Sequence, residues 1–473
     1  MDPHALDALA ERLPRGRVTD HHGEVATHAR DRWALALLRE ARGARVPPPA
    51  AVVFPQTTEE VAVVLRWACD AGATIVPRAG ASGLAGGAEA IKRSVVLDLH
   101  RLNRILDLDD LSQTVTVEAG VKGGDLERSL AAKGFTTGHD PESLEISTVG
   151  GWVATSSQGA ASAGFGGASD LVLGLTAVLP GGEVLRLKPS PRPDTGPDLR
   201  RLLAGSEGTL AVITELTLAV SRAPALVWDG FRPHSFESGA ALVREAVQRG
   251  FHPLVVNLLD DQEAGRMFGA FGHQGPVTLF GFDAAAPAIE ARRFELRQLS
   301  RDLGGRPVDR ELAEHWWDHR HDGVQWYEDV MGPDRALGRG VVADGMGVAC
   351  LWRRLPLVYE QVRGALFDHA ESVGCHLAHP YPTGASLNFS FVLRASTDGE
   401  VEDVYRDAWA DATAACLDAG GSPAHHGVGL LKAPFLAEEL GATGVDILRR
   451  VKAAFDPQWL LNPGKLVPRP EGL

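Results

Sequence analysis

The chain is predicted to be an α+β protein with more than one domain. Its 473 residues exceed what one hydrophobic core usually supports, so two or three domains are expected. Over residues 51–220, short strands alternate with glycine-rich loops; from about residue 223, longer strands and helices follow. These observations predict an N-terminal helical segment, a first domain, a second domain and a C-terminal segment, with bounds 1–46, 47–222, 223–424 and 425–473.

The elements of the N-terminal half follow from local signals. Apolar residues at three- and four-residue spacing predict helices over 5–13 and 29–41. Thr57 or Thr58 is expected to cap a helix that begins at Glu59 and ends near Ala71. Short apolar or alternating runs predict the strands of the first domain, at 51–54, 74–76, 95–99, 113–118 and 172–179.

The C-terminal half has longer periodic segments. Strands are predicted at 254–259, 277–282 and 386–393, and helices at 286–303, 403–418 and 445–455. This mixture of long strands and helices indicates a second α+β domain.

Composition excludes several classes of partner. The formal net charge is −14 and Lys and Arg form no run of five, which argues against nucleic acid or an anionic membrane as the main partner. No apolar run approaches the roughly 20 residues of a membrane span. The four cysteines are scattered without metal-ligand spacing, which indicates reduced thiols in the cytoplasm. A small-molecule substrate is therefore the expected partner, and a homodimer is left open.

Three loops have the composition of a binding site for a phosphorylated ligand. Small residues let backbone N–H groups approach a pyrophosphate, and hydroxyls can bond a polyol chain. Each loop taken alone would also suit an ordinary turn or hairpin. The candidate residues of the first loop are Pro77, Arg78, Ala79, Gly80, Ala81, Ser82 and Gly83. Those of the second are Pro141, Glu142, Ser143, Ser147, Thr148, Gly150, Gly151, Ser156, Ser157 and Gly159, and those of the third are Glu207, Gly208, Val212 and Ile213.

In this order, the three loops resemble the FAD domain of the vanillyl-alcohol-oxidase superfamily, also called the p-cresol-methylhydroxylase type. Residues 456–465 near the chain end resemble the C-terminal signature of the same family. The resemblance implies a two-subdomain FAD-binding domain, an α+β cap domain over the flavin, and a chain end that returns to the FAD domain. Noncovalent FAD is expected because the first loop has no His, Cys or Tyr; His139 is a residual attachment candidate.

A narrower resemblance is to alkyldihydroxyacetonephosphate synthase, carried by residues 137–153, 205–215 and 424–429. That enzyme is implied to exchange an acyl for an alkyl group through a flavin adduct. The position of its tyrosine falls on Asn388, and that of one arginine falls on Asn257. A further arginine maps near Arg339. An amide cannot exchange protons as a tyrosine can, which argues against the synthase reaction.

The chain also resembles the D-2-hydroxyacid dehydrogenases of the glycolate and D-lactate type. Their implied metal set would place His379 as a first ligand, but Asn388 falls near the second and His425 replaces the expected glutamate. Without a carboxylate ligand, no metal is predicted.

The catalytic candidates are His425, His426, Arg339 and Asn388, and the candidate substrate-binding residues are Asn257, His379 and Tyr381. One histidine of the pair can take a hydroxyl proton while the substrate gives a hydride to flavin N5, and Arg339 can hold an anionic group. The predicted function is an FAD-dependent oxidoreductase that oxidises a small hydroxyl-bearing substrate, with or without an anionic group. The alternatives are the alkyl-for-acyl transferase and a flavin-binding protein with little catalysis.

Overall fold

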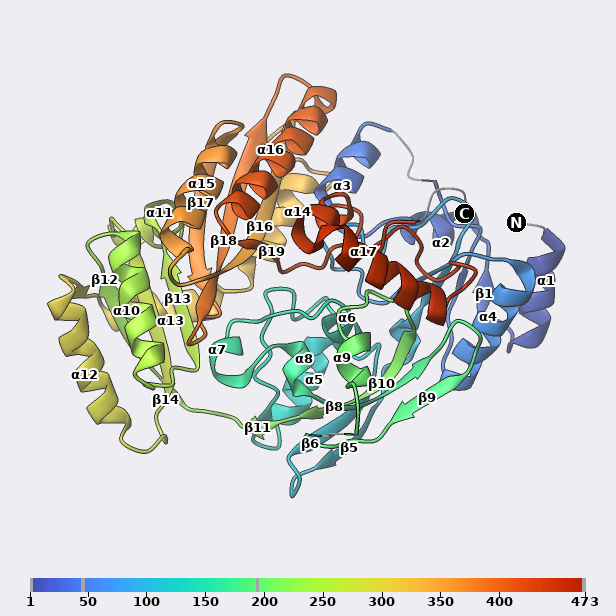
Figure 1. Ribbon diagram of the computed structural model, residues 1–473, viewed down its shortest axis with the longest axis horizontal. Helices are drawn as coiled ribbons and strands as arrows, with labels where there is room; N and C mark the ends of the chain where they lie inside the picture. Colours follow the sequence, from blue (N-terminus) through green and yellow to red (C-terminus); the bar gives the residue numbers. More distant parts are fainter. Residues whose placement is uncertain (1–2, 44–46, 193–194, 470–473) are drawn as a thin grey trace.

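The strands of the computed structural model form four sheets within the residues that it describes, 3–43, 47–192 and 195–469. Two main sheets lie in the N-terminal half, and one eight-stranded sheet forms most of the C-terminal half (Figure 1). A two-stranded ribbon joins β7 to β11 near the boundary between the halves. Across these residues, the structure shows no helix long and apolar enough to cross a membrane.

Three of the four strands of the first sheet run parallel to one another. β4 lies between β2 and β3, and β1 pairs antiparallel with β2. The side chain of Thr57 accepts a hydrogen bond from the amide of Glu60, which confirms the predicted cap of helix α4. The elements are α1 (Pro3–Arg12), β1 (Val18–Thr19), α2 (His22–Thr27), α3 (Ala34–Ala41), β2 (Ala51–Val53), α4 (Thr58–Ala71), β3 (Ile75–Arg78), β4 (Val95–Asp98) and the 3-10 turn Leu99–Arg101.

The second sheet has five antiparallel strands in the order β5-β6-β10-β8-β9. Its apolar side chains form a separate core with helices α5 and α6. The elements are β5 (Ile105–Asp109), β6 (Thr114–Glu118), α5 (Gly123–Ala131), β7 (Phe135–Thr136), α6 (Val149–Ala154), α7 (Ser162–Phe165), α8 (Ala168–Leu171), β8 (Val172–Val178), β9 (Val184–Leu187), α9 (Leu199–Leu203), β10 (Val212–Ala219) and β11 (Ser221–Arg222).

The eight-stranded sheet runs in the order β15-β12-β14-β13-β17-β18-β16-β19. Alternation along β18 gives it two unlike faces, because Leu387, Phe389 and Phe391 are buried in the apolar core while Asn388 points the opposite way. The strands are β12 (Leu226–Arg232), β13 (Val255–Leu259), β14 (Val277–Asp283), β15 (Arg306–Pro307), β16 (Val341–Leu351), β17 (Ala370–Ala378), β18 (Gly384–Arg394) and β19 (Ser422–Ala424).

Helices α10, α15 and α16 cover the apolar face of this sheet, and α11 and α13 pack at its β12–β13 end. The helices are α10 (Phe236–Gln248), α11 (Asp261–Phe268), α12 (Ile289–Asp302), α13 (Arg310–His319), α14 (Asp322–Met331), α15 (Leu355–Phe367), α16 (Asp398–Asp418) and α17 (Leu436–Phe455), with 3-10 turns at Gly269–Phe271 and Ala433–Phe435.

Both ends of the chain bridge the two halves. Helix α3 packs on β16, and the indole N–H of Trp33 donates to Tyr405 Oη at 3.1 Å. At the other end, Lys452 Nζ donates to the carbonyl of Thr209 at 2.6 Å, and Leu461 bridges to Ile75 of β3. Helix α17, coloured red in Figure 1, thus lies between the eight-stranded sheet and the first domain.

Candidate functional site

The three glycine-rich loops lie in contact with one another. A Cβ at position 80 would overlap the carbonyl oxygen of Ile146, so the first loop packs directly on the second. A Cβ at Gly208 would lie 3.1 Å from Pro77 Cγ, which places the third loop on the first. The amide of Gly205 donates to the carbonyl of Val153 at 2.9 Å. Segments far apart in sequence therefore form one cradle, called here the cofactor loops (residues 77–87, 141–159 and 205–213).

Several hydroxyls of the second loop already have protein partners. Trp152 Nε1 donates to Ser147 Oγ at 2.7 Å, and Ser157 Oγ bonds His139 Nε2 at 2.9 Å. Thr148 caps helix α6, and Ser156 Oγ accepts from Ser169 Oγ. These hydroxyls shape the loop, which leaves much of the ligand contact to the backbone.

The third loop leads into β10. The first residues of this strand are paired with β8 on one side but not with β6 on the other. Val212 and Ile213 pair with β8, but the pairing of β10 with β6 begins only at Glu215. The side chains of Val212 and Ile213 are buried. On the β6 side, their backbone is therefore placed to meet the edge of a planar ring.

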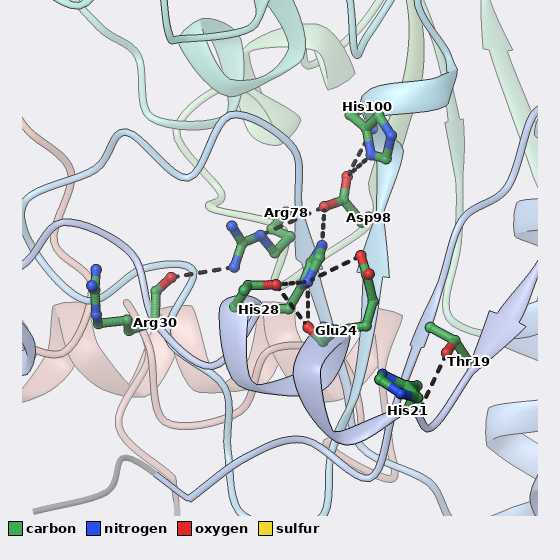
Figure 2. Close-up of polar contacts among 9 residues, drawn as sticks. Thr19, His21, Glu24, His28, Arg30, Arg78, Asp98 and His100 are labelled. Carbon is green, nitrogen blue, oxygen red and sulfur yellow. Dashed lines mark hydrogen bonds and ion pairs between the residues drawn. The ribbon is translucent and has the colours of Figure 1, made fainter. Parts of the chain in front are cut away.

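Arg78 of the first loop turns its side chain into a polar cluster rather than toward open space (Figure 2). Its Nη1 donates to the carbonyl of Arg30 at 3.2 Å, and its Nε lies 3.7 Å from Asp98 Oδ2. Asp98 also bonds His28 Nε2 at 3.1 Å and His100 Nδ1 at 2.8 Å. Burial alone would raise the pKa of Asp98, but bonds from the two histidines outweigh it and hold the pKa below its ordinary value.

Asp98→Asn is expected to lower the free energy of unfolding by about 2–4 kcal/mol at pH 7, because it leaves buried donors without a charged acceptor. A carboxyl with a lowered pKa stabilises the fold above its unfolded value of 3.8 and loses that effect as the pH falls. The difference between wild type and variant in urea unfolding should therefore shrink below about pH 4.

Asp70→Asn is the matched control, because Asp70 pairs with Arg12 at an exposed site and should cost less than about 1 kcal/mol. Equal midpoints of urea unfolding for Asp98→Asn and Asp70→Asn would contradict the stabilising role of the cluster.

The segment 424–429, called here the histidine loop, has an unusual backbone. His425 and His426 both lie in the left-handed region, with φ of 58° and 57°, and Gly427 and Gly429 follow with positive φ. Such conformations cost free energy in residues other than glycine and persist where the surroundings enforce them. Lys432, 6% exposed, donates from Nζ to the carbonyls of Ala424 at 2.9 Å and His425 at 2.5 Å.

The polar side of the eight-stranded sheet faces this loop. His376, Asn388 and Gly347 are directly paired across β17, β18 and β16, and His376 is also paired with Leu259 of β13. Asn257, two residues before Leu259, therefore lies on the same face. This face, defined by Asn257, His376 and Asn388, is called the interdomain face.

The two histidines of the loop sit over glycines of β16. A Cβ at Gly347 would come within 2.8 Å of His425 Cδ2, and a Cβ at Gly345 would lie 3.9 Å from His426 Cε1. Glycine at 347 thus makes room for an imidazole on the interdomain face. The ring of His379 lies 5.1 Å from that of His425.

Several buried polar atoms here have no protein partner. They are Asn257 Oδ1, His379 Nδ1 and His425 Nε2. Buried polar atoms are nearly always satisfied, so such a group marks a place where a ligand can complete the bonding. His426, in contrast, is exposed to solvent.

The imidazoles of this site are held neutral near pH 7. Burial lowers the pKa of His379 to about 3, with a smaller effect of His376. Burial, followed by the nearby His379, lowers the pKa of His425 well below its ordinary value. The His426 ring is partly open to solvent, but the protein atoms crowded around it desolvate it and, with the charge of Lys432, lower its pKa to about 4. Neutral imidazoles can accept protons, which charged ones cannot.

Of the two remaining candidates, Tyr381 lies at the site and Arg339 does not. Tyr381 Oη donates to Gln158 Oε1 of the second loop at 3.3 Å, which joins the site to the cofactor loops. Arg339 is exposed and precedes β16. The start of that strand lies about 20 Å from Gly347, counted along the strand. The structure therefore does not bring Arg339 to the histidines.

Sequence reasoning missed Arg266, Glu263 and Lys432. Arg266 Nη2 contacts both Glu263 and Ser390 beside Gly374, on the interdomain face. The i,i+3 spacing of Glu263 and Arg266 predicts their pairing, but nothing in the sequence places them on this sheet. Lys432 was the third, and only the fold reveals that it holds the histidine loop.

Asp140, the residue just before the second loop, is bonded to the turn between helices α13 and α14. Asp140 Oδ2 accepts from Arg320 Nε at 2.5 Å, and Asp140 Oδ1 bonds His321 Nε2 at 2.8 Å. Protein atoms around the Glu142 carboxyl desolvate it and, with the nearby charge of Glu263, raise its pKa to about 7.

Comparison with known proteins gives concordant matches. Residues 49–188 match the model of an FAD binding domain, and residues 230–466 match the C-terminal domain of FAD linked oxidases. An uncharacterized FAD-linked oxidoreductase of Escherichia coli O157:H7, YgcU, is 30% identical over 439 residues, covering 89% of this chain and 90% of that protein. Alkyldihydroxyacetonephosphate synthase of Trypanosoma brucei brucei is 28% identical, over 98% of this chain and 81% of that protein. The structure of p-cresol methylhydroxylase with substrate bound is similar with a TM-score of 0.79 at 14% identity, covering 98% of this chain and 96% of that chain.

Proposed function

Because the chain belongs to the FAD-linked oxidases, we propose that it oxidises a small hydroxyl-bearing substrate by hydride transfer to flavin N5. Membership confirms the resemblance drawn from the three loops, and with it FAD as the cofactor and the p-cresol-methylhydroxylase type of fold. The family description and the relative from Escherichia coli O157:H7 both support an FAD-linked oxidoreductase. The choice of substrate and of the proton acceptor is the proposal.

The cofactor loops fit a flavin dinucleotide. Gly80 and Gly208 bring three backbone segments together without side chains between them, which suits a pyrophosphate. When bound, FAD supplies the hydride acceptor. Noncovalent binding is part of the proposal: His139 is fully buried with its ring against Trp152, so it offers no group to the surface of the loops.

His426 is proposed as the general base, and its exposure is the observation that carries the proposal. Its imidazole lies by Gly345 at the interdomain face, is reachable by a substrate, and is neutral near pH 7. It can therefore take the hydroxyl proton as the substrate carbon is oxidised. His425, whose Nε2 is buried without a partner, is better placed to orient than to receive the proton.

The amides of the interdomain face suit substrate binding. Asn257 keeps an unpartnered carbonyl oxygen, and Asn388 presents an amide where the synthase pattern has tyrosine. Both can donate to or accept from a hydroxyl or carbonyl group without exchanging a proton. His379, with its unpartnered Nδ1, can complete the same set of bonds.

The charges at this face favour oxidation of a small hydroxyl compound over transfer on a phosphate ester. Arg266 is already shared between Glu263 and Ser390, Arg339 lies away from the site, and Glu142, near Glu263, adds a carboxyl that is about half ionised at pH 7. A doubly charged phosphate would have to compete with these carboxylates, whereas a hydroxyl or a single carboxylate would meet less repulsion.

The deciding experiment is anaerobic mixing of the FAD-loaded protein with candidate 2-hydroxy acids and simple alcohols in a stopped-flow spectrometer. Bleaching of the flavin absorbance by a substrate supports the oxidation. Replacement of the acyl group of an acyl dihydroxyacetone phosphate by a fatty alcohol, with release of the fatty acid and the flavin returned to its oxidised spectrum, would instead establish the transferase.

The rate of flavin reduction is expected to persist at acid pH. Desolvation by the protein atoms around the ring, followed by the charge of Lys432, lowers the pKa of His426 to about 4, so the base remains unprotonated well below pH 6. The limiting rate of reduction, measured by pH-jump from pH 8 down to pH 4, should fall only near pH 4–5. His376, His379, His425 and His426 are neighbours, so the midpoint of the pH profile reports the coupled titration of the four imidazoles. A midpoint at or above 6.5 would contradict His426 as the base.

A further inference from the structure

Glu207 of the third cofactor loop directs its carboxylate at the histidine loop. The side chain is 8% exposed. Oε1 accepts from the amide of Val428 at 2.5 Å, and Oε2 accepts from the amide of Gly429 at 2.8 Å. One carboxylate thus receives two adjacent backbone N–H groups from a segment more than 200 positions later in the chain.

The backbone of Glu207 is at the same time part of the cofactor loops. Its amide donates to the carbonyl of Ala154 at 2.9 Å, in the second loop. Its carbonyl accepts from Asn462 Nδ2 at 2.8 Å, and the same amide nitrogen of Asn462 also donates to Gly87 at 3.1 Å. Glu207 therefore bonds the second loop and the histidine loop directly and is linked to the first loop through Asn462.

The histidine loop needs external support. Its two left-handed histidines are held on one side by Lys432, which bonds the carbonyls of Ala424 and His425. Glu207 supplies the support on the other side, through the amides that follow Gly427. A Cβ at Gly427 would lie 3.0 Å from Glu207 Oε1, so the contact is close. Both residues thus bond the backbone of the loop that carries His426.

We propose that Glu207 is a positioning residue that fixes His426 by tying the histidine loop to the cofactor loops. The inference rests on the proposed role of His426. It assigns to the third loop a role beyond the proposed holding of FAD: a residue of the cofactor loops also sets the position of the proposed base.

Glu207→Gln is the sharpest change, because it keeps the size of the side chain. The glutamine carbonyl can accept from one amide, but its NH2 would face the other amide as a second donor. The variant is expected to keep one FAD per chain and a substrate Kd within about threefold, and to lower the limiting rate of flavin reduction by about 10–100-fold. Stopped-flow reduction measures the rate and the Kd separately.

A double-mutant cycle with His426→Gln tests whether Glu207 acts through the base. In the His426→Gln background, Glu207→Gln should cause little further loss of rate. A general structural defect would instead multiply the two losses. Glu89→Gln is the control, because it removes another carboxylate near Lys465 that contacts neither Val428 nor Gly429; it should reduce at the wild-type rate.

Multiplying losses in the cycle, loss of FAD from Glu207→Gln, or an unchanged rate of reduction in that variant would each overturn the inference. Wild-type reduction by His426→Gln would instead refute the proposed base, whatever Glu207 does. If Glu207→Gln does not fold, Gly427→Ala tests the same link from the loop side, because its Cβ would press on Glu207 Oε1. That variant should slow reduction and retain FAD; unchanged reduction would overturn the inference.

Discussion

His426→Gln is expected to leave the protein folded and loaded with FAD while the limiting rate of flavin reduction falls by about 10²–10⁴-fold, the usual contribution of a general base. Gln has a similar reach but cannot accept a proton from a hydroxyl. The site gives no sign that another group would substitute easily: His425 Nε2 is buried, and Asn388 and Asn257 are amides. The measurement is anaerobic stopped-flow reduction with saturating substrate.

His425→Gln is the matched comparison, because it removes the neighbouring imidazole from the same strained turn. We expect a loss of about tenfold or less, since that ring packs over Gly347 and orients its neighbour. A larger loss in His425→Gln than in His426→Gln would exchange the roles of the two residues. Full reduction by both variants would remove the base from this loop altogether.

Gly80→Ala is expected to abolish FAD binding. Any Cβ at position 80 would overlap the carbonyl oxygen of Ile146, a backbone atom that can move only if the second loop moves. Separating the first and second loops would open the cradle at the point where backbone N–H groups are needed for the pyrophosphate. The flavin absorbance relative to protein absorbance after gel filtration should fall by about tenfold or more, and Gly80→Val should behave the same way.

Gly364→Ala provides the control, because Gly364 is an exposed position in helix α15 with nothing within 4 Å of the added Cβ. It should bind FAD fully and gain slightly in stability, as Ala favours a helix over Gly. Far-UV circular dichroism distinguishes loss of cofactor from loss of fold. Stoichiometric flavin in folded Gly80→Ala would show that the first loop does not contribute to the cradle.

Local signals predicted the regular elements well. Thr57 caps α4 as its hydroxyl and the following glutamates indicate, and the alternating runs before Leu259 and around Asn388 form β13 and β18. The second predicted helix failed at its start: α3 begins only at Ala34, since the Asp31 carboxylate bonds the amide of Trp33 and holds the chain in a turn. A periodic pattern does not reveal such a side-chain competitor.

The site was predictable where it depends on composition and motif, and not where it depends on tertiary placement. The loops around Gly80 and Gly208 and the pair His425–His426 stand out by residue type. Arg339 illustrates the limit, because motif alignment brought it into the site, whereas the length of β16 carries it away. Glu207 reads as part of a cofactor loop, and only the meeting of two distant segments shows where its carboxylate points.

The packing of helix α3 on β16 has a consequence for synthesis on the ribosome. Leu35 and Leu38 belong to the same buried core as Val341 and Val348, although about 300 residues separate them in sequence. At roughly 5–20 residues per second, the apolar face of α3 would wait on the order of 15–60 seconds for its partner strand to emerge. During that interval the apolar face of α3 has no partner strand in the nascent chain, so this face stays exposed until the C-terminal half is complete.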